Sequence, residues 1–315
     1  MRNIKIIEVR SEIGAGTRGA SLGIDALKIA ALDYMSSFFV NFPTEEVETE
    51  NKLLYEPVES PFAKRIRGVL RMYERVANSI CENLKGGLFP VVLAGDHSSA
   101  GGTIAGIKMA RPQSKLGVVW IDAHADLHSP YTTPSGNMHG MPLAASLGED
   151  NLDSRVHQPD AQTVELWNKL KSVGGIQPKI APEDLVFIGL RDLEREEEHI
   201  IKKGGIKVIT VAELRRKGVE NVVRQAMLHL AHCDEIYVSF DVDSLDSAIS
   251  RGTGTPVSNG LKEREAEDLV ASLMQNHKIC CLEVTEVNPT LDKENLMAEI
   301  AFNILQRSVN LLLMN

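Results

Sequence analysis

Short apolar runs that each end in polar or charged residues recur along the chain, and they constrain its fold more than any other feature. The runs are rich in Val, Ile and Leu and cover 89–94, 116–121, 185–190, 236–240 and 279–285. Continuous apolar runs of this length are typical of strands buried on both faces of a parallel sheet. The sequence therefore predicts a largely parallel sheet with both faces covered.

Amphipathic segments of helical length lie between several of these runs. They cover 64–84, 163–173, 219–232 and 262–275. Alternation of strands and helices predicts an α/β layer fold with right-handed crossovers. No repeat, low-complexity tract or long linker divides the sequence, so we expect one domain over residues 1–315. In such folds ligands bind at the carboxyl ends of the strands, and here those ends hold concentrated Asp, His and Glu.

The polar residues after three of the runs are of the types that bind divalent metals. The motif D-A-H-A-D at 122–126 follows the second run, and period-two spacing in an extended segment would send its three polar side chains to one side. D-V-D at 241–243 and G-D-H at 95–97 follow two other runs. Carboxylate and imidazole together suit first-row divalent metals, and carboxylate-rich sets favour manganese.

This set of groups is too large for one tetrahedral metal site, and the lack of Cys in it argues against structural zinc. Six ligands with two bridging carboxylates would hold a pair of cations, which lowers the pKa of a shared water. The alternative is that these groups only cap strand ends. Buried carboxylates without a counter-charge are costly, so the metal interpretation is favoured.

The composition of the chain excludes some classes of binding partner and indicates its cellular compartment. The net charge of −9 and pI near 5.6 argue against nucleic acid or an anionic membrane surface as a partner. The charged N-terminal stretch does not fit a signal peptide, and no run is long enough to span a membrane. Four cysteines without C-x-x-C spacing indicate reduced core thiols. We therefore expect a cytoplasmic protein.

At the metal-type motifs the chain resembles the ureohydrolase family, which includes arginase and agmatinase. The resemblance rests on G-D-H-S at 95–98, D-A-H-A-D at 122–126, S-G-N-M-H-G at 135–140, S-F-D-V-D at 239–243, G-T-P at 254–256 and E-V-N-P at 286–289. It implies a single three-layer α/β domain with a mostly parallel sheet of about eight strands flanked by helices. The S-G-N-M-H-G and E-V-N-P segments favour arginase, which converts L-arginine and water to L-ornithine and urea.

The resemblance also implies a pair of manganese ions per subunit. One ion would be held by His97, Asp122, Asp126 and Asp241. The other would be held by His124, Asp122, Asp241 and Asp243, with Asp122 and Asp241 bridging. Cobalt, nickel or iron would suit the same ligand types.

Further roles follow from the same resemblance. His139 would carry a proton to the leaving amine, and Glu286 would orient the guanidinium; Asp126 is counted with them as catalytic. The alternative for His139 is a loop histidine that is hydrogen-bonded to the backbone, and the alternative for Glu286 is a strand-end acid in a salt bridge. The predicted substrate-binding residues are His128, Thr133, Ser135, Asn137, Glu194, Glu197 and Thr255.

Some positions depart from the family pattern. His128 stands where arginases usually have Asn, and Glu194 stands where they usually have Asp. Ala94 replaces a usual Gly, and the segment 246–251 differs from the common pattern. None of these changes removes a metal ligand, so they concern mainly the amino-acid end of the substrate.

Other functions stay open on the sequence. One alternative to arginase is another ureohydrolase, of the agmatinase, guanidinobutyrase or formimidoylglutamase type. It would use the same metal chemistry on another small guanidino or formimino compound. A non-catalytic metal-binding sensor and an amide-cleaving metal deacetylase are the remaining alternatives. Ureohydrolases are commonly homo-oligomers, so we expect a trimer or hexamer.

Overall fold

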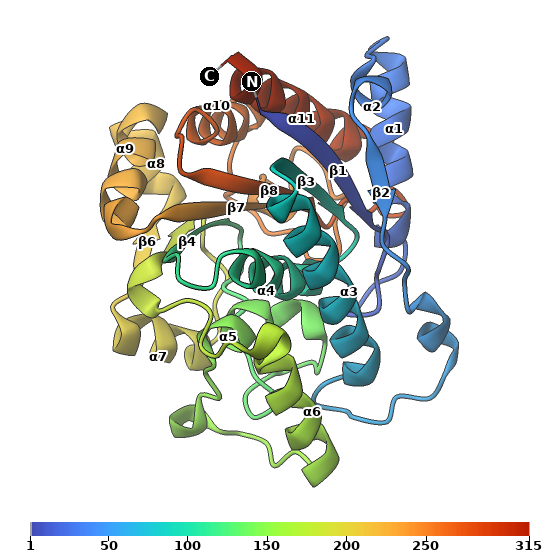
Figure 1. Cartoon of the computed structure of the whole chain (residues 1–315), viewed down its shortest axis with the longest axis vertical. Helices are drawn as coiled ribbons and strands as arrows, with labels where there is room; N and C mark the ends of the chain where they lie inside the picture. Colours follow the sequence, from blue (N-terminus) through green and yellow to red (C-terminus); the bar gives the residue numbers. More distant parts are fainter. Residues whose placement is uncertain (1, 315) are drawn as a thin grey trace.

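The computed structural model describes residues 2–314 and contains one eight-stranded sheet (Figure 1). Its strands are β1 (Asn3–Val9), β2 (Thr44–Glu46), β3 (Leu88–Ala94), β4 (Leu116–Ile121), β5 (Leu185–Ile188), β6 (Lys207–Ile209), β7 (Glu235–Asp241) and β8 (Ile279–Thr285). Their order is β2-β1-β3-β8-β7-β4-β5-β6, and every pairing is parallel. The predicted α/β fold with a parallel sheet of about eight strands is confirmed.

Five of the strands coincide with the apolar runs of the sequence, although β5 ends at Ile188, two residues before its run does. The sequence did not single out β1, β2 and β6. β2 and β6 are edge strands of three residues each, and β1 carries Lys5 and Glu8 among its apolar residues. Short or charge-interrupted strands lack the continuous apolar pattern and form here by pairing with a neighbour.

Helices cover both faces of the sheet (Figure 1). They are α1 (Gly23–Asp33), α2 (Phe38–Asn41), α3 (Ile66–Lys85), α4 (Ala100–Ala110), α5 (Pro142–Leu147), α6 (Ala161–Lys171), α7 (Arg195–Gly204), α8 (Val211–Lys217), α9 (Val219–His229), α10 (Glu263–Leu273) and α11 (Leu296–Met314). The predicted helices correspond to α3, α6, α9 and α10 within a few residues, and the last turn of the third, 230–232, is 3₁₀.

Two apolar cores lie on opposite faces of the sheet. Successive strand residues alternate between them: Val118 packs in the core with α3, α4 and α6, and Val119 packs in the core with α1, α9, α10 and α11. This alternation follows from the period-two geometry of a strand. Both faces are apolar, which is why the strands read as continuous hydrophobic runs.

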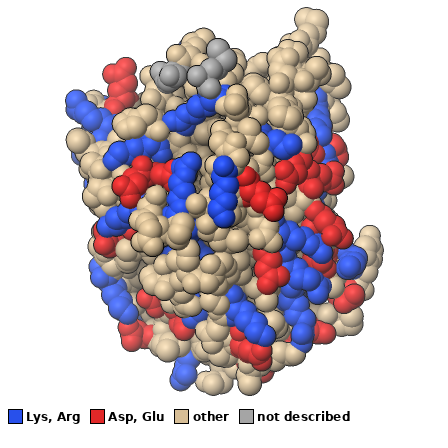
Figure 2. Space-filling view, viewed as in Figure 1, with Lys and Arg blue, Asp and Glu red and all other residues tan. Residues whose placement is uncertain are grey.

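The four cysteines are free and buried, in agreement with the prediction of reduced core thiols. Between residues 2 and 314 we find no helix with the length and apolar character needed to cross a bilayer. On the face drawn in Figure 2, basic and acidic side chains are interspersed, without a broad area of one sign.

Candidate active site

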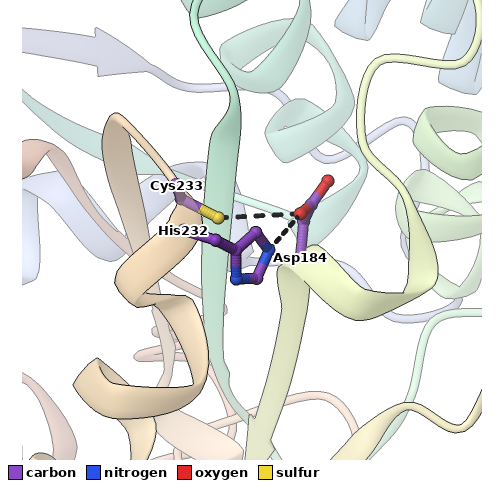
Figure 3. Close-up of side chains that lie close together, drawn as sticks. All are labelled: Asp184, His232 and Cys233. Atoms are coloured by element: carbon purple, nitrogen blue, oxygen red, sulfur yellow. Dashed lines mark hydrogen bonds and ion pairs between the residues drawn. The ribbon is translucent and has the colours of Figure 1, made fainter.

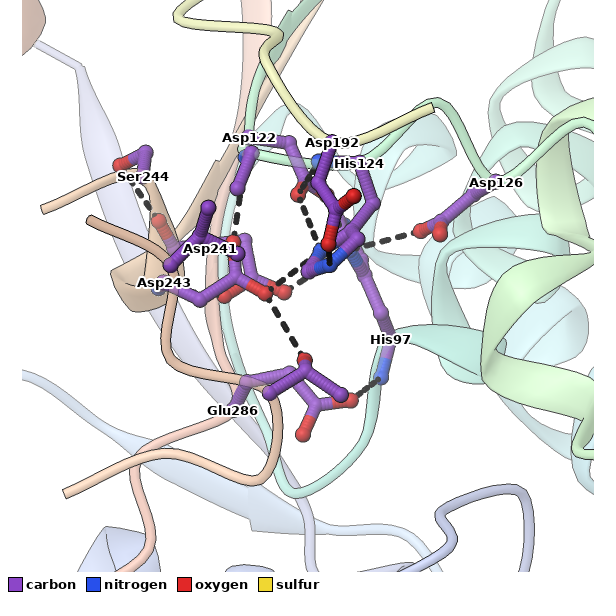
Figure 4. A network of polar contacts seen from close by, with 12 residues as sticks. His97, Asp122, His124, Asp126, Asp192, Asp241, Asp243, Ser244 and Glu286 are labelled. Atoms are coloured by element: carbon purple, nitrogen blue, oxygen red, sulfur yellow. Dashed lines mark hydrogen bonds and ion pairs between the residues drawn. The ribbon is translucent and has the colours of Figure 1, made fainter. Parts of the chain in front are cut away.

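The candidate active site lies at the carboxyl ends of four adjacent strands, β3, β8, β7 and β4. Each strand delivers polar side chains just beyond its last apolar residue, and these side chains converge in Figure 4. His97 follows β3, Glu286 follows β8, Asp243 follows β7 and Asp122 follows β4. Segments that are far apart in the sequence are neighbours here because the parallel strands all end at the same edge.

His97 lies at the centre of one half of the cluster. Its Nδ1 atom is 3.0 Å from Asp122 Oδ2, 3.1 Å from Asp126 Oδ2 and 3.1 Å from Asp241 Oδ2. The ring is held from behind: Nε2 shares a 2.7 Å hydrogen bond with the hydroxyl of Ser239, and the ring stacks on Trp120. Nδ1 therefore faces three carboxylates.

His124 lies in the other half of the cluster. Its Nδ1 atom is 2.9 Å from Asp243 Oδ2 and 3.5 Å from Asp122 Oδ1. Asp122 thus presents one oxygen to His97 and the other to His124 (Figure 4), as a bridging carboxylate would. Asp241 contacts the first half through Oδ2, and its Oδ1 accepts a hydrogen bond from the Asp243 amide.

The expected extended geometry of residues 122–126 is wrong, although their side chains do converge. β4 ends at Ile121, and Asp126 has a left-handed backbone with φ of 53°. Backbone hydrogen bonds shape the turn instead: the His124 amide donates to Asp122 Oδ1, and the Ala123 amide donates to Asp243 Oδ1. A left-handed non-glycine residue costs of order 1–3 kcal/mol and is common at functional sites.

The buried carboxylates of the cluster lie so close together that positive charge is needed to stabilise them. Burial and the neighbouring carboxylate of Asp122 raise the pKa of Asp243 to about 6, and burial with Asp243 and Asp122 raises that of Asp241 well above its ordinary value. Burial opposes charge on His97, but the three facing carboxylates outweigh it and raise its pKa. Buried like charges at this spacing are stable only when protons or cations neutralise them.

The residues fit a pair of divalent cations. Among buried polar atoms, His97 Nδ1 and Asp122 Oδ2 have no hydrogen-bond partner although they are 3.0 Å apart. Both are lone-pair donors at the centre of the cluster. Two groups have ligand atoms close enough to share an ion, His97 with Asp122 and Asp126, and His124 with Asp122 and Asp243. Carboxylate and imidazole donors together suit divalent first-row metals.

The close packing of buried carboxylates in the cluster predicts that the stability of the metal-free protein depends on pH. The folded-state pKa of Asp243, about 6, lies above its usual 3.8, so the folded chain holds more of this proton than the unfolded chain between those values. Protonation of Asp243 therefore adds to the free energy of unfolding below about pH 4, and this contribution is lost as pH rises through 6. We expect Asp243→Asn in chelator to gain in melting temperature relative to the parent chain from about pH 4 to 6, measured by thermal denaturation. Asp192→Asn, an exposed carboxylate, should show no such trend; equal trends would contradict the prediction.

His139 and Glu286 form an ion pair beside the cluster. His139 Nδ1 donates to Glu286 Oε1 over 3.1 Å, and the same oxygen accepts the His97 amide at 2.9 Å. Burial would lower the pKa of His139, but Glu286 raises it to about 9. Glu286 has φ of 67° and is buried, whereas His139 is partly exposed. The structure therefore places the predicted guanidinium acceptor behind the predicted proton carrier.

The loop that carries Thr133, Ser135 and Asn137 is fixed by local hydrogen bonds. Thr133 Oγ1 accepts the Gly136 amide, and Ser135 Oγ accepts the Asn137 amide. Gly136 has φ of 76°, and a Cβ there would collide with the carbonyl oxygen of Pro61. Lys64, which the sequence did not indicate as a site residue, donates to Asn137 Oδ1 at 3.1 Å.

His128, Glu194 and Glu197 meet next to this loop. His128 Nε2 is 3.2 Å from Glu194 Oε2 and 3.7 Å from Glu197 Oε2. The hydrogen bond from His128 holds the pKa of Glu194 at about 2. Burial and Glu194 raise the pKa of Glu197, whose carboxylate accepts the Leu127 and Glu194 amides.

A cavity of about 280 Å³ joins the cluster to this acidic end. All the predicted site residues line it except Glu286, which lies behind His139. Thr255 also contacts the cluster directly, because its hydroxyl donates to Asp243 Oδ2 at 3.1 Å. Asp192, which the sequence marked only as a strand-end residue, lines the cavity and lies 3.6 Å from His124 Nε2.

Arg191 is another residue whose role the sequence did not show. Its guanidinium donates to the carbonyl oxygens of Asp243, Leu245 and Val257 through Nη2, and Nε donates to that of Ser258. It thereby ties the turn after β7 to the loop that leads from Thr255. Only tertiary contacts reveal this, because the carbonyls lie more than 50 residues away.

Comparison with known proteins agrees with this geometry. The arginase family model matches residues 2–309. The arginase of Brevibacillus brevis is 37% identical over 313 residues, covering 95% of each chain. The chain belongs to the arginase family.

Solved arginases share the fold of this family member over nearly its whole length. The crystal structure of arginase from Bacillus subtilis superposes with a TM-score of 0.81 at 33% identity, covering 98% of both chains. That of Bacillus caldovelox arginase gives 0.81 at 34% identity and covers 97% of both. The ureohydrolase resemblance is confirmed, and the chain is a hydrolase of the arginase type.

Proposed function

We propose that this arginase-family hydrolase converts L-arginine and water to L-ornithine and urea with two manganese ions. The observation that carries the proposal is one cavity with two different ends: a cluster of four aspartates and two histidines, and the group formed by His128, Glu194 and Glu197. L-Arginine has a guanidinium at one end and an α-amino acid group at the other. Three relatives that are 33% to 37% identical to this chain are named arginase, which supports the same substrate.

The six cluster residues would hold the two ions, with Asp122 placed to bridge. When bound, the ions supply Lewis-acid activation of water for attack on the guanidinium carbon. His97 is preset for this task because Ser239 and Trp120 fix its ring. Thr255 restrains Asp243 in the same way through its hydroxyl.

Glu286 and His139 would handle the guanidinium and the proton. A planar guanidinium suits a carboxylate acceptor, and Glu286 is held ionised despite its burial by His139 and by the His97 amide. Glu286 lies behind His139 and both donors use its Oε1, so Oε2 is the oxygen that would accept the guanidinium. The Nδ1 proton of His139 is donated to Glu286. Glu286 also raises the pKa of His139 to about 9 against the effect of burial, so at neutral pH His139 lines the cavity with a second proton, on Nε2, to transfer. It is therefore the group that would deliver a proton to the leaving amine.

The acidic end would bind the α-amino acid group. Glu194 is ionised beside the cavity and would accept the α-ammonium, which displaces His128 from it. The freed His128 Nε2 and the hydroxyl of Ser135 would then be available as donors to the α-carboxylate. This arrangement gives His128 the donor role in place of an amide side chain.

The test is urea release by manganese-loaded protein offered L-arginine, agmatine, 4-guanidinobutyrate and guanidinopropionate in parallel. We expect L-arginine to have the highest kcat/KM. Agmatine lacks the α-carboxylate, and loss of a hydrogen bond to a charged group should cost about 10- to 100-fold. A higher kcat/KM for another compound would contradict the proposal that L-arginine is the substrate. If all four compounds are inert, a formimino compound should be tested. No turnover with both ions bound would favour the metal-sensor alternative.

Replacing Glu194 by Gln should raise the KM for L-arginine by about tenfold, with little change in kcat, because its ionic contact is with the non-reacting end. The measurement is steady-state urea release with L-arginine and with 4-guanidinobutyrate, which lacks the α-ammonium and should be insensitive. Glu198→Gln is the matched control, since Glu198 lies on α7 and pairs with Lys202 instead. An equal KM increase for both compounds would argue against α-ammonium recognition.

A further inference from the structure

Asp184, His232 and Cys233 lie close together (Figure 3). They lie at the amino-terminal ends of the strands, whereas the candidate active site lies at the carboxyl ends. Asp184 is the last residue before β5, and Cys233 lies two residues before β7. β4 lies between these strands in the sheet. The three side chains therefore join the amino-terminal ends of two strands across a third.

The distances suit a shared ion. His232 Nε2 is 2.8 Å from Asp184 Oδ1, and Cys233 Sγ is 3.6 Å from the same oxygen. One ligand atom from each residue lies within 4.8 Å of the others. The spacing between His232 and Asp184 matches the 2.9 Å between His124 and Asp243 in the candidate active site.

The surroundings orient the ligand atoms. Asp184 Oδ2 accepts the Ala181 amide, which leaves Oδ1 facing His232 and Cys233. A Cβ at Gly117 on β4 would lie 3.1 Å from Cys233 Sγ, so glycine leaves room for the sulfur. Asp184 and Cys233 are buried, whereas the His232 side chain is 38% exposed, so an ion can enter past the imidazole.

We infer that Asp184, His232 and Cys233 form a second cation site, which takes Zn²⁺ or Co²⁺ with water as the fourth ligand. Thiolate, imidazole and carboxylate favour these ions in tetrahedral geometry, whereas the sulfur-free cluster suits manganese. Binding replaces the Cys233 thiol proton by the cation and releases that proton to solvent. The ion would tie the start of β5 to the start of β7.

Lys115 competes for this position. Its Nζ atom is 3.3 Å from Asp184 Oδ1 and 3.9 Å from Glu183 Oε1. The side chain is 42% exposed and can move to Glu183 when the site fills. Without an ion, Lys115 compensates the charge of Asp184, so its removal should strengthen cation binding.

The first test is the absorption spectrum of the full protein, already loaded with manganese, during titration with Co²⁺. A sulfur-to-cobalt charge-transfer band is expected, and it cannot come from the candidate active site because no cysteine lies there. Cys233→Ser and His232→Asn should remove the band, and Cys81→Ser should keep it. Absence of the band, or its persistence in Cys233→Ser, would overturn the inference.

The second test uses Zn²⁺ and Lys115→Met. Zn²⁺ should raise the melting temperature of the manganese-loaded parent but not of Cys233→Ser, and Lys115→Met should bind it at least several-fold more tightly. Zinc bound equally by the parent and Cys233→Ser would mean adventitious binding by exposed histidine and would overturn the site. Urea release measured alongside separates this from the proposed arginase reaction, because failure of either result leaves the other standing.

Discussion

Asp122→Asn is expected to abolish most urea release and to lower the manganese content of the protein. Asp122 is the carboxylate that presents one oxygen to each half of the cluster, at 3.0 Å from His97 and 3.5 Å from His124. Burial disfavours its charge, but the two imidazoles outweigh burial and hold its pKa below the usual range. Changes to residues that only support metal ligands cost about 10- to 100-fold, so loss of a bridging ligand should reduce kcat/KM by at least about 100-fold.

The matched control is Asp192→Asn. Asp192 is a neighbouring aspartate whose side chain is 64% exposed and 3.6 Å from His124 Nε2. Metal content by elemental analysis, urea release and melting temperature should be measured on both variants. If Asp122→Asn keeps both ions and normal turnover, the bridging role is wrong. If both variants lose metal equally, the cluster is held by charge alone and not by specific ligands.

His139→Gln is expected to lower kcat by about 10²- to 10⁴-fold, the usual contribution of a positioned proton donor. Manganese content should not change, because His139 contacts Glu286 rather than the six cluster residues. Glu286 raises the pKa of His139 to about 9, so the proton is present at neutral pH and is lost as pH rises through 9. The parent kcat should therefore fall on the alkaline side, and the variant should lack that fall.

The control for His139 is His199→Gln, an exposed histidine on α7 that lies 3.8 Å from Asp153. Its kcat and pH profile should match those of the parent. An unchanged kcat in His139→Gln would assign the proton to another group. A loss of metal in that variant would mean that the His139–Glu286 pair supports the cluster through the His97 amide.

Much of the fold was predictable because its central strands are buried on both faces. Runs such as 116–121 carry an uninterrupted apolar pattern that few other structures allow. β6, by contrast, has three residues and exists through its pairing with β5. An edge strand of that length has no sequence pattern of its own, so its prediction needs the neighbour.

The members of the candidate site were also visible in the sequence, because Asp and His concentrate after those strands. The arrangement of these residues in space was not visible in the sequence. The extended geometry expected for 122–126 gives way to a turn with Asp126 in a left-handed conformation. That turn depends in part on a hydrogen bond from the Ala123 amide to Asp243, more than 100 residues away.

The sequence by itself determined the layered fold and the residue types of the metal cluster, since both follow from local patterns of apolar and ligand side chains. The tertiary structure alone decided which groups share an oxygen or a proton. It paired Glu286 with His139, placed His128 against Glu194, and brought Asp184 to His232 and Cys233. Such pairings depend on the strand order, which joins segments remote in the chain and is encoded by the packing of the whole sheet rather than by any one segment.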